Sequence, residues 1–179
     1  MRLTRASKTL SGVLCALPLC ISLPASAGET GTAQAAFDRL KSLAGTWHGS
    51  ASEKGGPAME MAHIFRVSAG GTVVMETMDP GSPDHEMINM YHLDGDELVL
   101  THYCAGNNQP TMRLAQPLPA ANEMRFDFTG GTNLDPAKDE HIHGTRLVFV
   151  DDDTLESSWT GYKDGRDNGT MTITLQRAE

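Results

Sequence analysis

Runs of alternating apolar and polar residues, each about the length of a β-strand, fill most of the chain from residue 46 onward. Alternation with a period of two predicts strands that bury one face. Turn-forming residues separate the runs, as at Ala69-Gly70-Gly71, Asp94-Gly95-Asp96 and Asp164-Gly165. The pattern predicts ten strands, near residues 46–52, 58–67, 72–78, 86–93, 97–104, 111–117, 122–129, 141–150, 154–163 and 169–177.

A helical pattern precedes the strands. Phe37, Leu40 and Leu43 recur at helical spacing and Thr32 can cap the start, so residues 32–43 are predicted to form one short helix. Ten strands joined mostly by tight turns favour an all-β fold, a ten-stranded up-and-down antiparallel barrel with this one N-terminal helix, because closure removes edge strands. A two-sheet sandwich is the alternative, since strand count alone does not establish closure.

Residues 1–27 have the three-part layout of a secretory signal peptide. A basic start is followed by an apolar stretch from Gly12 to Leu23 and by Ala25-Ser26-Ala27. The apolar stretch is short for a bilayer span, and Pro18 interrupts it. We therefore expect an exported protein, periplasmic or secreted, whose residues 28–179 form a single barrel domain with no membrane insertion after the signal is removed.

Charge and cysteine content narrow the classes of partner. Cleavage would remove three of the 14 basic residues and none of the 23 acidic ones, which leaves 11 against 23 and a formal net charge of −12. Such a surface repels phosphate backbones and anionic lipids, which argues against nucleic acid or a membrane surface as partner. Cleavage would also remove Cys15 and Cys20, so that Cys104 would remain as a lone thiol with no internal disulfide.

The turns also predict which side chains share a face. A tight turn at Asp94-Gly95 directs one set toward the interior: Met87, Asn89, Tyr91, Leu93, Leu98, Leu100, His102 and Cys104. The turn at residues 68–71 groups Met61, His63, Phe65, Val67, Thr72, Val74, Glu76 and Met78. Farther on, one face carries His141, His143, Thr145, Leu147 and Phe149, and another carries Leu155, Ser157 and Trp159.

Four of these side chains are candidate metal ligands: Glu76, His102, His141 and His143. Histidines two residues apart on a strand lie about 7 Å apart, and a third histidine with a glutamate would complete a set suited to zinc, iron or manganese. If Cys104 or the methionines took part instead, copper(I) would be preferred. The same polar groups can equally bond to one another or to buried water with no metal present, and Cys104 can be a small buried hydrophobe.

The helix leading into Gly45-Thr46-Trp47, followed by a meander of strands, resembles the Gly-x-Trp opening of lipocalin-like (calycin) barrels. The resemblance implies that the tryptophan closes one end and that a late basic residue, here Arg177, packs across it. Residues 43–49 also look like the opening of nitrobindin-like barrels, which hold haem, but the strand at 169–177 has no histidine to bind haem. Residues 70–74, 91–96 and 101–104 look like segments of uncharacterised secreted bacterial proteins assigned to this group.

The barrel pattern and its mixed interior predict an exported pocket protein that binds a small, partly apolar ligand. A metal-dependent enzyme or metalloprotein, and a filled barrel with a structural or interaction role, are the alternatives. The sequence leaves open whether a reaction occurs and whether a divalent metal is the cofactor, and it disfavours haem. The residues predicted to line the pocket are Glu76, Met87, Asn89, Tyr91, Leu100, His102, Cys104, Phe149 and Trp159.

Overall fold

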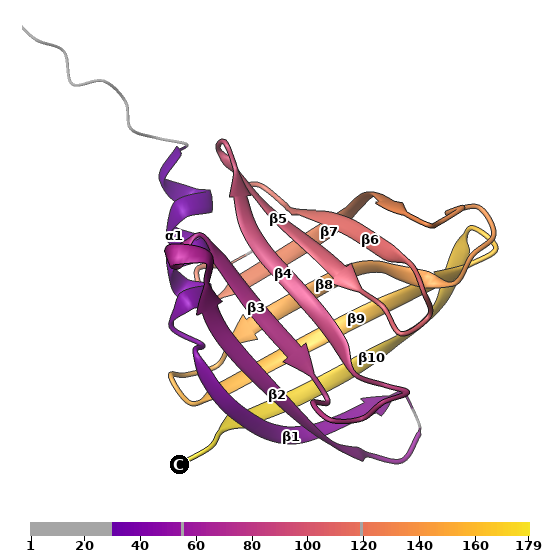
Figure 1. The fold of residues 1–179 in the computed structure, drawn as a ribbon, viewed down its shortest axis with the longest axis horizontal. Coiled ribbons are helices and arrows are strands. Elements are labelled where there is room, and N and C mark those ends of the chain that lie inside the picture. The colour runs from indigo at the N-terminus through magenta and orange to yellow at the C-terminus, as the bar shows by residue number, and fades with distance from the viewer. Residues whose placement is uncertain (1–29, 55, 119) are drawn as a thin grey trace, which may run out of the picture.

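The computed structural model describes residues 30–54, 56–118 and 120–179, and the predicted signal peptide lies outside them. One α-helix, α1 (Thr30–Lys41), precedes ten strands that form a closed antiparallel barrel, in which β1 pairs with β10 (Figure 1). The predicted barrel with one short N-terminal helix is therefore confirmed, and the sandwich alternative is wrong. The strands are β1 (Gly45–Glu53), β2 (Met59–Ser68), β3 (Val73–Met78), β4 (Met87–Asp94), β5 (Glu97–Tyr103), β6 (Gln109–Leu114), β7 (Glu123–Thr132), β8 (His141–Phe149), β9 (Thr154–Lys163) and β10 (Arg166–Arg177).

β7 and β10 run farther than predicted, for the same reason. β7 continues to Thr132, whereas the pattern predicts an end at residue 129, and β10 begins at Arg166 instead of residue 169. The β6–β7 and β9–β10 ladders each contain a shift in pairing register. A bulge interrupts the alternation of side chains without ending the strand, so the sequence pattern stops before the strand does.

The helix α1 turns one apolar face toward the barrel. Four residues at helical spacing are buried: Ala33, Ala36, Phe37 and Leu40. The helix packs against β4 and β5 and lies at one end of the barrel (Figure 1). The side chain of Thr32, the predicted cap, lies outside the described part of the chain. Within that part, no helix is both long and apolar enough to cross a membrane.

Trp47 fills the end of the barrel near α1. Its side chain is 0% exposed, and its Nε1 donates a hydrogen bond to Leu43 O at 2.8 Å. The ring meets Phe65 edge-on, with centroids 6.3 Å apart, and the Arg177 guanidinium lies 4.3 Å from the ring centroid. This contact between Trp47 and a late basic residue is the one that the Gly-x-Trp resemblance implies, and it ties the first strand to the last.

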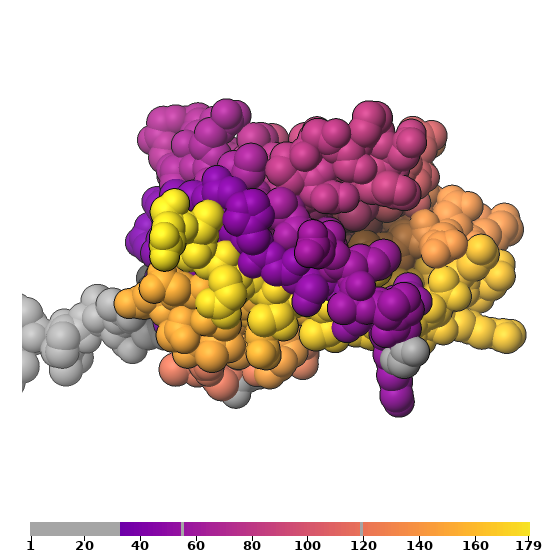
Figure 2. Space-filling view, turned by 90° about the horizontal axis from the view of Figure 1, so that it is seen from below, coloured from indigo at the N-terminus to yellow at the C-terminus, as the bar shows by residue number. Residues whose placement is uncertain are grey.

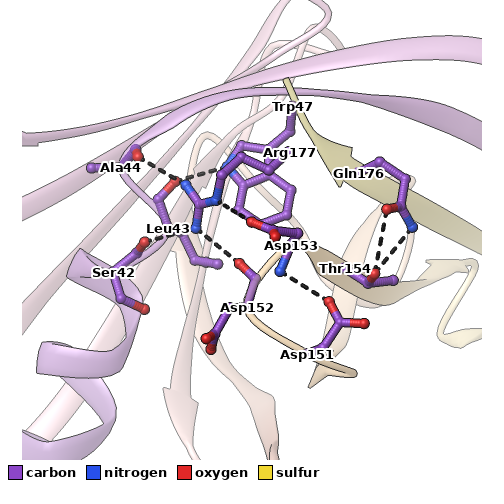
Figure 3. A network of polar contacts seen from close by, with 10 residues as sticks. All are labelled: Ser42, Leu43, Ala44, Trp47, Asp151, Asp152, Asp153, Thr154, Gln176 and Arg177. Atoms are coloured by element: carbon purple, nitrogen blue, oxygen red, sulfur yellow. Dashed lines mark hydrogen bonds and ion pairs between the residues drawn. The ribbon is translucent and has the colours of Figure 1, made fainter. Parts of the chain in front are cut away.

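Arg177 also ties the last strand to two turns (Figure 3). Its guanidinium donates to the carbonyl oxygens of Ser42, Ala44 and Asp152 and to Oδ1 of Asp153, over 3.0–3.1 Å. The exit of α1, the β8–β9 turn and β10 are thereby held together at what we call the closed end. Because connections in an up-and-down barrel alternate between its ends, the β1–β2, β3–β4, β5–β6, β7–β8 and β9–β10 connections lie at the opposite end, the open end (Figure 1).

The seam between β1 and β10 is closely packed. Residues 47–53 of β1 pair with residues 171–177 of β10. A Cβ at Gly49 would overlap the backbone of Thr174, so glycine allows the two strands to approach. In the space-filling view, the indigo atoms of the first strand lie between yellow atoms of the last strand and the magenta part of the barrel (Figure 2). The barrel is thus closed by strand pairing.

Candidate functional site

Five buried polar side chains meet inside the barrel. Glu76 on β3 lies opposite Asn89 on β4, and Asn89 lies opposite His102 on β5. His63 on β2 and Tyr91 on β4 join them from the neighbouring rows. All five are at most 2% exposed, so their polar atoms need partners within the protein.

The Glu76 carboxylate is the centre of this polar cluster. His63 Nδ1 donates to Oε1 at 2.7 Å, while Asn89 Nδ2 and Tyr91 Oη donate to Oε2 at 2.7 and 2.8 Å. Burial by itself raises the pKa of a carboxyl group, but these hydrogen bonds and the charge of His63 outweigh it and hold the pKa of Glu76 below its usual value. Burial and the adjacent carboxylate raise the pKa of Tyr91, which keeps the phenol a donor.

Asn89 connects the carboxylate to His102 and determines the tautomer of that histidine. Since Asn89 Nδ2 donates to Glu76, its Oδ1 is the atom that meets His102 Nδ1, at 2.7 Å. An amide oxygen only accepts, so the network assigns the proton of His102 to Nδ1 and a lone pair to Nε2. Burial lowers the pKa of His102 to about 4, against a smaller opposing effect of Glu76. The neutral imidazole thus has a buried Nε2 with no hydrogen-bond partner among the described residues.

His102 borders a cavity of about 200 Å³ toward the open end. Trp159 lies beside the imidazole, with ring centroids 5.7 Å apart. Exposed polar residues form the rim, Glu53 and Glu140 among them. The volume suits a compact organic molecule and is too small for haem. Apolar and sulfur-containing side chains form most of the remaining lining: Met61, Met78, Met87, Cys104, Ile142, Met171 and Ile173.

A wider groove of about 710 Å³ adjoins this cavity. It is bordered by the β5–β6 and β7–β8 connections and shares four lining residues with the cavity: Cys104, Glu140, Ile142 and Gly161. The groove gives a small molecule a route from solvent toward His102.

The predicted pocket residues divide into three groups. Four of them line the cavity: Met87, His102, Cys104 and Trp159. Three lie behind His102 in the polar cluster: Glu76, Asn89 and Tyr91. Leu100 is fully buried in the core, and Phe149 lies by α1, where the Arg39 guanidinium is 4.4 Å from its ring centroid. Alternation alone brought Leu100 and Phe149 into the prediction, because it assigns a face over the whole length of a strand and does not say which residues reach the open end.

His141 and His143 do not join this cluster, contrary to the predicted convergence with Glu76. A bulge in β8 after Ile142 shifts the pairing register. Ile142 therefore lies opposite Gly161 and lines the cavity, whereas His141 lies opposite Tyr162, on the other face of β9. The strict alternation from which both histidines were assigned to the interior fails at this bulge.

The two histidines bond to each other. His141 Nδ1 donates to Asp139 O at 2.8 Å, so its Nε2 accepts from His143 Nδ1 at 3.0 Å. The His143 ring lies between Tyr162 and Phe128, with centroids 3.8 and 4.6 Å away. Burial and the neighbouring His141 lower the pKa of His143. Stacking and mutual hydrogen bonding hold this pair away from the polar cluster, and His141, 3% exposed, lines the wider groove.

The predicted four-ligand divalent centre is not assembled. Within the described residues, no group of three or more His, Cys, Asp or Glu side chains is placed to hold a metal ion. Of the four predicted ligands, the polar cluster unites Glu76 with His102 through Asn89, and the bulge separates His141 and His143 from them.

Acid is expected to destabilise the fold through His102. Its folded-state pKa of about 4 lies below the usual 6.5, so between these values the unfolded chain binds a proton that the buried imidazole excludes. The free energy of unfolding should therefore decrease as the pH is lowered from 6.5 to about 4. The total decrease at the lower end of this window should be on the order of 3 kcal/mol. Urea denaturation at about pH 7 and about pH 4.5 measures this. His102→Gln should lose less stability than the wild type, while His48→Gln, on the exposed face of β1, should lose as much; equal losses in all three would contradict a proton-excluding His102.

Some members of the site were not among the predicted site residues. His63 was assigned to the same face as Glu76, and the hairpin register that puts Glu76 opposite Phe65 makes His63 its diagonal neighbour. Met171 lies opposite Trp159 across the β9–β10 ladder. Both residues could have been predicted by comparing which residues lie opposite each other on neighbouring strands, instead of reading the alternation of each strand separately.

Comparison with known proteins leaves the function open. No protein-family model and no curated protein matches the chain. Among solved structures, the fold is similar to that of a protein of unknown function from the DUF3598 family of Nostoc punctiforme, with 14% identity and a TM-score of 0.43. The match covers 78% of this chain and 48% of the other, so this chain spans about half the length of that protein.

Proposed function

We propose that this protein is an exported barrel that binds a small, partly apolar molecule in the cavity beside His102. The observation that carries this function is the buried Nε2 lone pair of His102, which has no hydrogen-bond partner among the described residues and belongs to a side chain that lines a largely apolar cavity. An unmatched buried acceptor costs roughly 1–3 kcal/mol. A ligand that donates a hydrogen bond to Nε2 recovers this free energy, so the site favours ligands with a donor.

The chemistry of the cavity restricts the ligand further. Met87 and Trp159 line the same cavity as His102 and offer apolar contacts to a ligand, and benzene in a cavity of about 150 Å³ sets the size scale. The rim carboxylates of Glu53 and Glu140 disfavour anions. A compact neutral molecule with one N–H or O–H group, on the scale of phenol or indole, fits these three conditions.

The support behind His102 also favours binding. Asn89 and Glu76 hold the imidazole in one tautomer and one orientation, so little ordering remains to be done when a ligand arrives. Because the pKa of His102 is about 4, the acceptor stays unprotonated over the physiological pH range. A fixed, neutral acceptor at the base of an apolar cavity is characteristic of a binding site.

We also propose a cellular location and a structural group. The signal-like residues 1–27 support export to the periplasm or the medium, and a mature N-terminus at Gly28 would be direct evidence for it. The packing of Arg177 across Trp47 supports a place among lipocalin-like barrels. Export and a ligand cavity together suit a carrier or scavenger of small molecules.

Phenol and toluene test the ligand chemistry, since they have similar size and only phenol donates a hydrogen bond. We expect the wild type to bind phenol at least about tenfold more tightly than toluene in calorimetric or NMR titrations, because only phenol satisfies Nε2. His102→Leu should remove this preference. Gly161→Leu should block both ligands at the rim, where a Cβ meets nothing closer than Gly169 O at 3.9 Å.

Each contrary result would indicate another class of protein. Equal binding of phenol and toluene, or full binding by Gly161→Leu, would rule out this cavity with its histidine acceptor. A wild type that binds neither compound, nor indole, would favour the filled barrel. Turnover of a bound compound would favour an enzyme built on the same cavity.

A further inference from the structure

A row of sulfur atoms lies beside the polar cluster, one step nearer the open end. Met78 on β3 pairs with Met87 on β4, and Cys104 directly follows Tyr103, which pairs with Ile88, the residue after Met87. All three sulfur-containing side chains line the cavity, as does His102. Same-face neighbours two residues apart on a strand are about 7 Å apart at Cα, within reach of a methionine side chain.

We propose that this cavity holds one copper(I) ion, bound by His102 Nε2 and by the sulfur atoms of Met87 and Cys104, with Met78 as a fourth donor. This inference goes beyond the binding of an organic molecule. It makes the same nitrogen a metal ligand, so the two occupants compete for His102.

The imidazole has the arrangement of a metal-binding histidine. Such a histidine donates its other ring N–H to a carboxylate, a carbonyl or a similar acceptor, which fixes the lone pair toward the metal. Here His102 Nδ1 donates to Asn89 Oδ1, and the Asn89 amide is held in turn by Glu76. Nε2, on a side chain 1% exposed, is left with its lone pair and no partner among the described residues.

The donors select a soft ion. Thioether and thiolate sulfur with imidazole prefer copper(I), whereas calcium, magnesium and manganese prefer oxygen. Met78 Sδ lies 3.3 Å from Asn89 Nδ2, which places this sulfur beside the same amide that orients His102. Cys104 Sγ accepts a hydrogen bond from the Gly106 N–H at 3.3 Å, which holds the sulfur in place at the edge of the cavity.

Charge at the rim favours the approach of a cation. Glu53 and Glu140 are exposed and line the mouth of the cavity. Lys163 Nζ, 3.2 Å from Glu140, offsets the negative charge of that carboxylate, so the attraction at the rim comes mainly from Glu53. The acidic chain as a whole, with 23 acidic against 14 basic residues, adds a long-range attraction for cations.

The test is competition for copper(I) between the protein and a chromophoric chelator, bathocuproine disulfonate, under anaerobic conditions with ascorbate. The background carries Cys15→Ser and Cys20→Ser, so that Cys104 is the one thiol. We expect one equivalent of copper(I) to stay with the protein. Met87→Leu and Cys104→Ser should each weaken binding by at least about tenfold, as even loss of a ligand's supporting group commonly does.

Met90→Leu is the matched control, because Met90 pairs with Met75 and Thr101 on the opposite face of β4. It should bind copper(I) as the background protein does. Complete transfer of copper(I) to the chelator by the background protein, or equal affinities for Met87→Leu and Met90→Leu, would overturn the copper site. Far-UV circular dichroism checks that each variant is folded.

Phenol binding separates this inference from the proposed function. Trp159→Ala removes an apolar wall that copper(I) does not need, so phenol binding should weaken while copper(I) binding stays at the level of the background protein. Copper(I) binding without phenol binding would support the metal site alone. In the wild type, one equivalent of silver(I) should shift the ¹³C-methyl NMR signal of Met87 and displace phenol; an unchanged Met87 signal would count against the copper site.

Discussion

Replacing Glu76 with Ala is expected to lower the free energy of unfolding by about 3–5 kcal/mol, because it leaves three buried hydrogen-bond donors unpaired at roughly 1–3 kcal/mol each. The side chain is 2% exposed and accepts hydrogen bonds from His63, Asn89 and Tyr91. Removing it leaves these three buried donors without an acceptor. No solvent reaches these atoms to replace the lost bonds, which is why the effect is large.

Urea denaturation at about pH 7, followed by tryptophan fluorescence and far-UV circular dichroism, measures this loss. Glu60→Ala is the control, because Glu60 lies on the exposed face of neighbouring β2. Its effect should stay within about 0.5 kcal/mol. A similar small change for Glu76→Ala would mean that the polar cluster contributes little to stability.

The same substitution carries a pH signature. The folded-state pKa of Glu76 lies below its usual value, so its stabilisation is present above the unfolded-state pKa and is lost as the pH falls through the folded one. The difference between wild type and Glu76→Ala should therefore shrink in acid. A difference that stayed constant down to about pH 3 would contradict an ionised Glu76.

The β4–β5 hairpin is where sequence and structure agree most closely. Gly95, with φ of 60°, turns the chain between Asp94 and Glu97, and this turn sets the register of both strands. Alternation then places Asn89 opposite His102 on the inner face. The centre of the site was predictable because a short turn determines which residues face each other over the whole hairpin.

β8 shows where this reasoning stops. One extra residue at the bulge after Ile142 moves His141 to the other face of the barrel wall, and hydrophobicity in the sequence does not record it. The stacking of His143 between Tyr162 and Phe128 depends on three strands and stabilises the shifted register. Such a placement follows from tertiary packing, which a pattern within one strand does not contain.

The alternation of apolar and polar residues did not predict where the cavity lies. Leu100 and Met87 share a face of the same sheet, yet Leu100 is packed in the core and Met87 borders the cavity. The difference lies in what covers each end: Trp47 and Arg177 fill the closed end, while the described residues at the open end are connections between strands. The Gly-x-Trp resemblance indicated which end would be filled.

The two tryptophans of the chain should therefore respond differently to truncation. Trp47→Ala is expected to cost about 3–5 kcal/mol, because it opens a sealed void and removes the bond to Leu43 O and the support for Arg177. Trp159→Ala should cost less, since Trp159 borders a cavity that opens toward solvent and water can enter the enlarged space.

Ligand binding should follow the opposite order. Trp159→Ala removes an apolar wall beside His102 and should weaken phenol binding, whereas Trp47→Ala, measured at a temperature where it is still folded, should bind phenol as the wild type does. Calorimetric melting ranks the two variants by stability, and phenol titration independently ranks them by affinity. Equal losses of stability would contradict a sealed closed end, and unchanged phenol binding by Trp159→Ala would contradict a site at the open end. The contrast follows from a barrel whose two ends divide stability and binding between them.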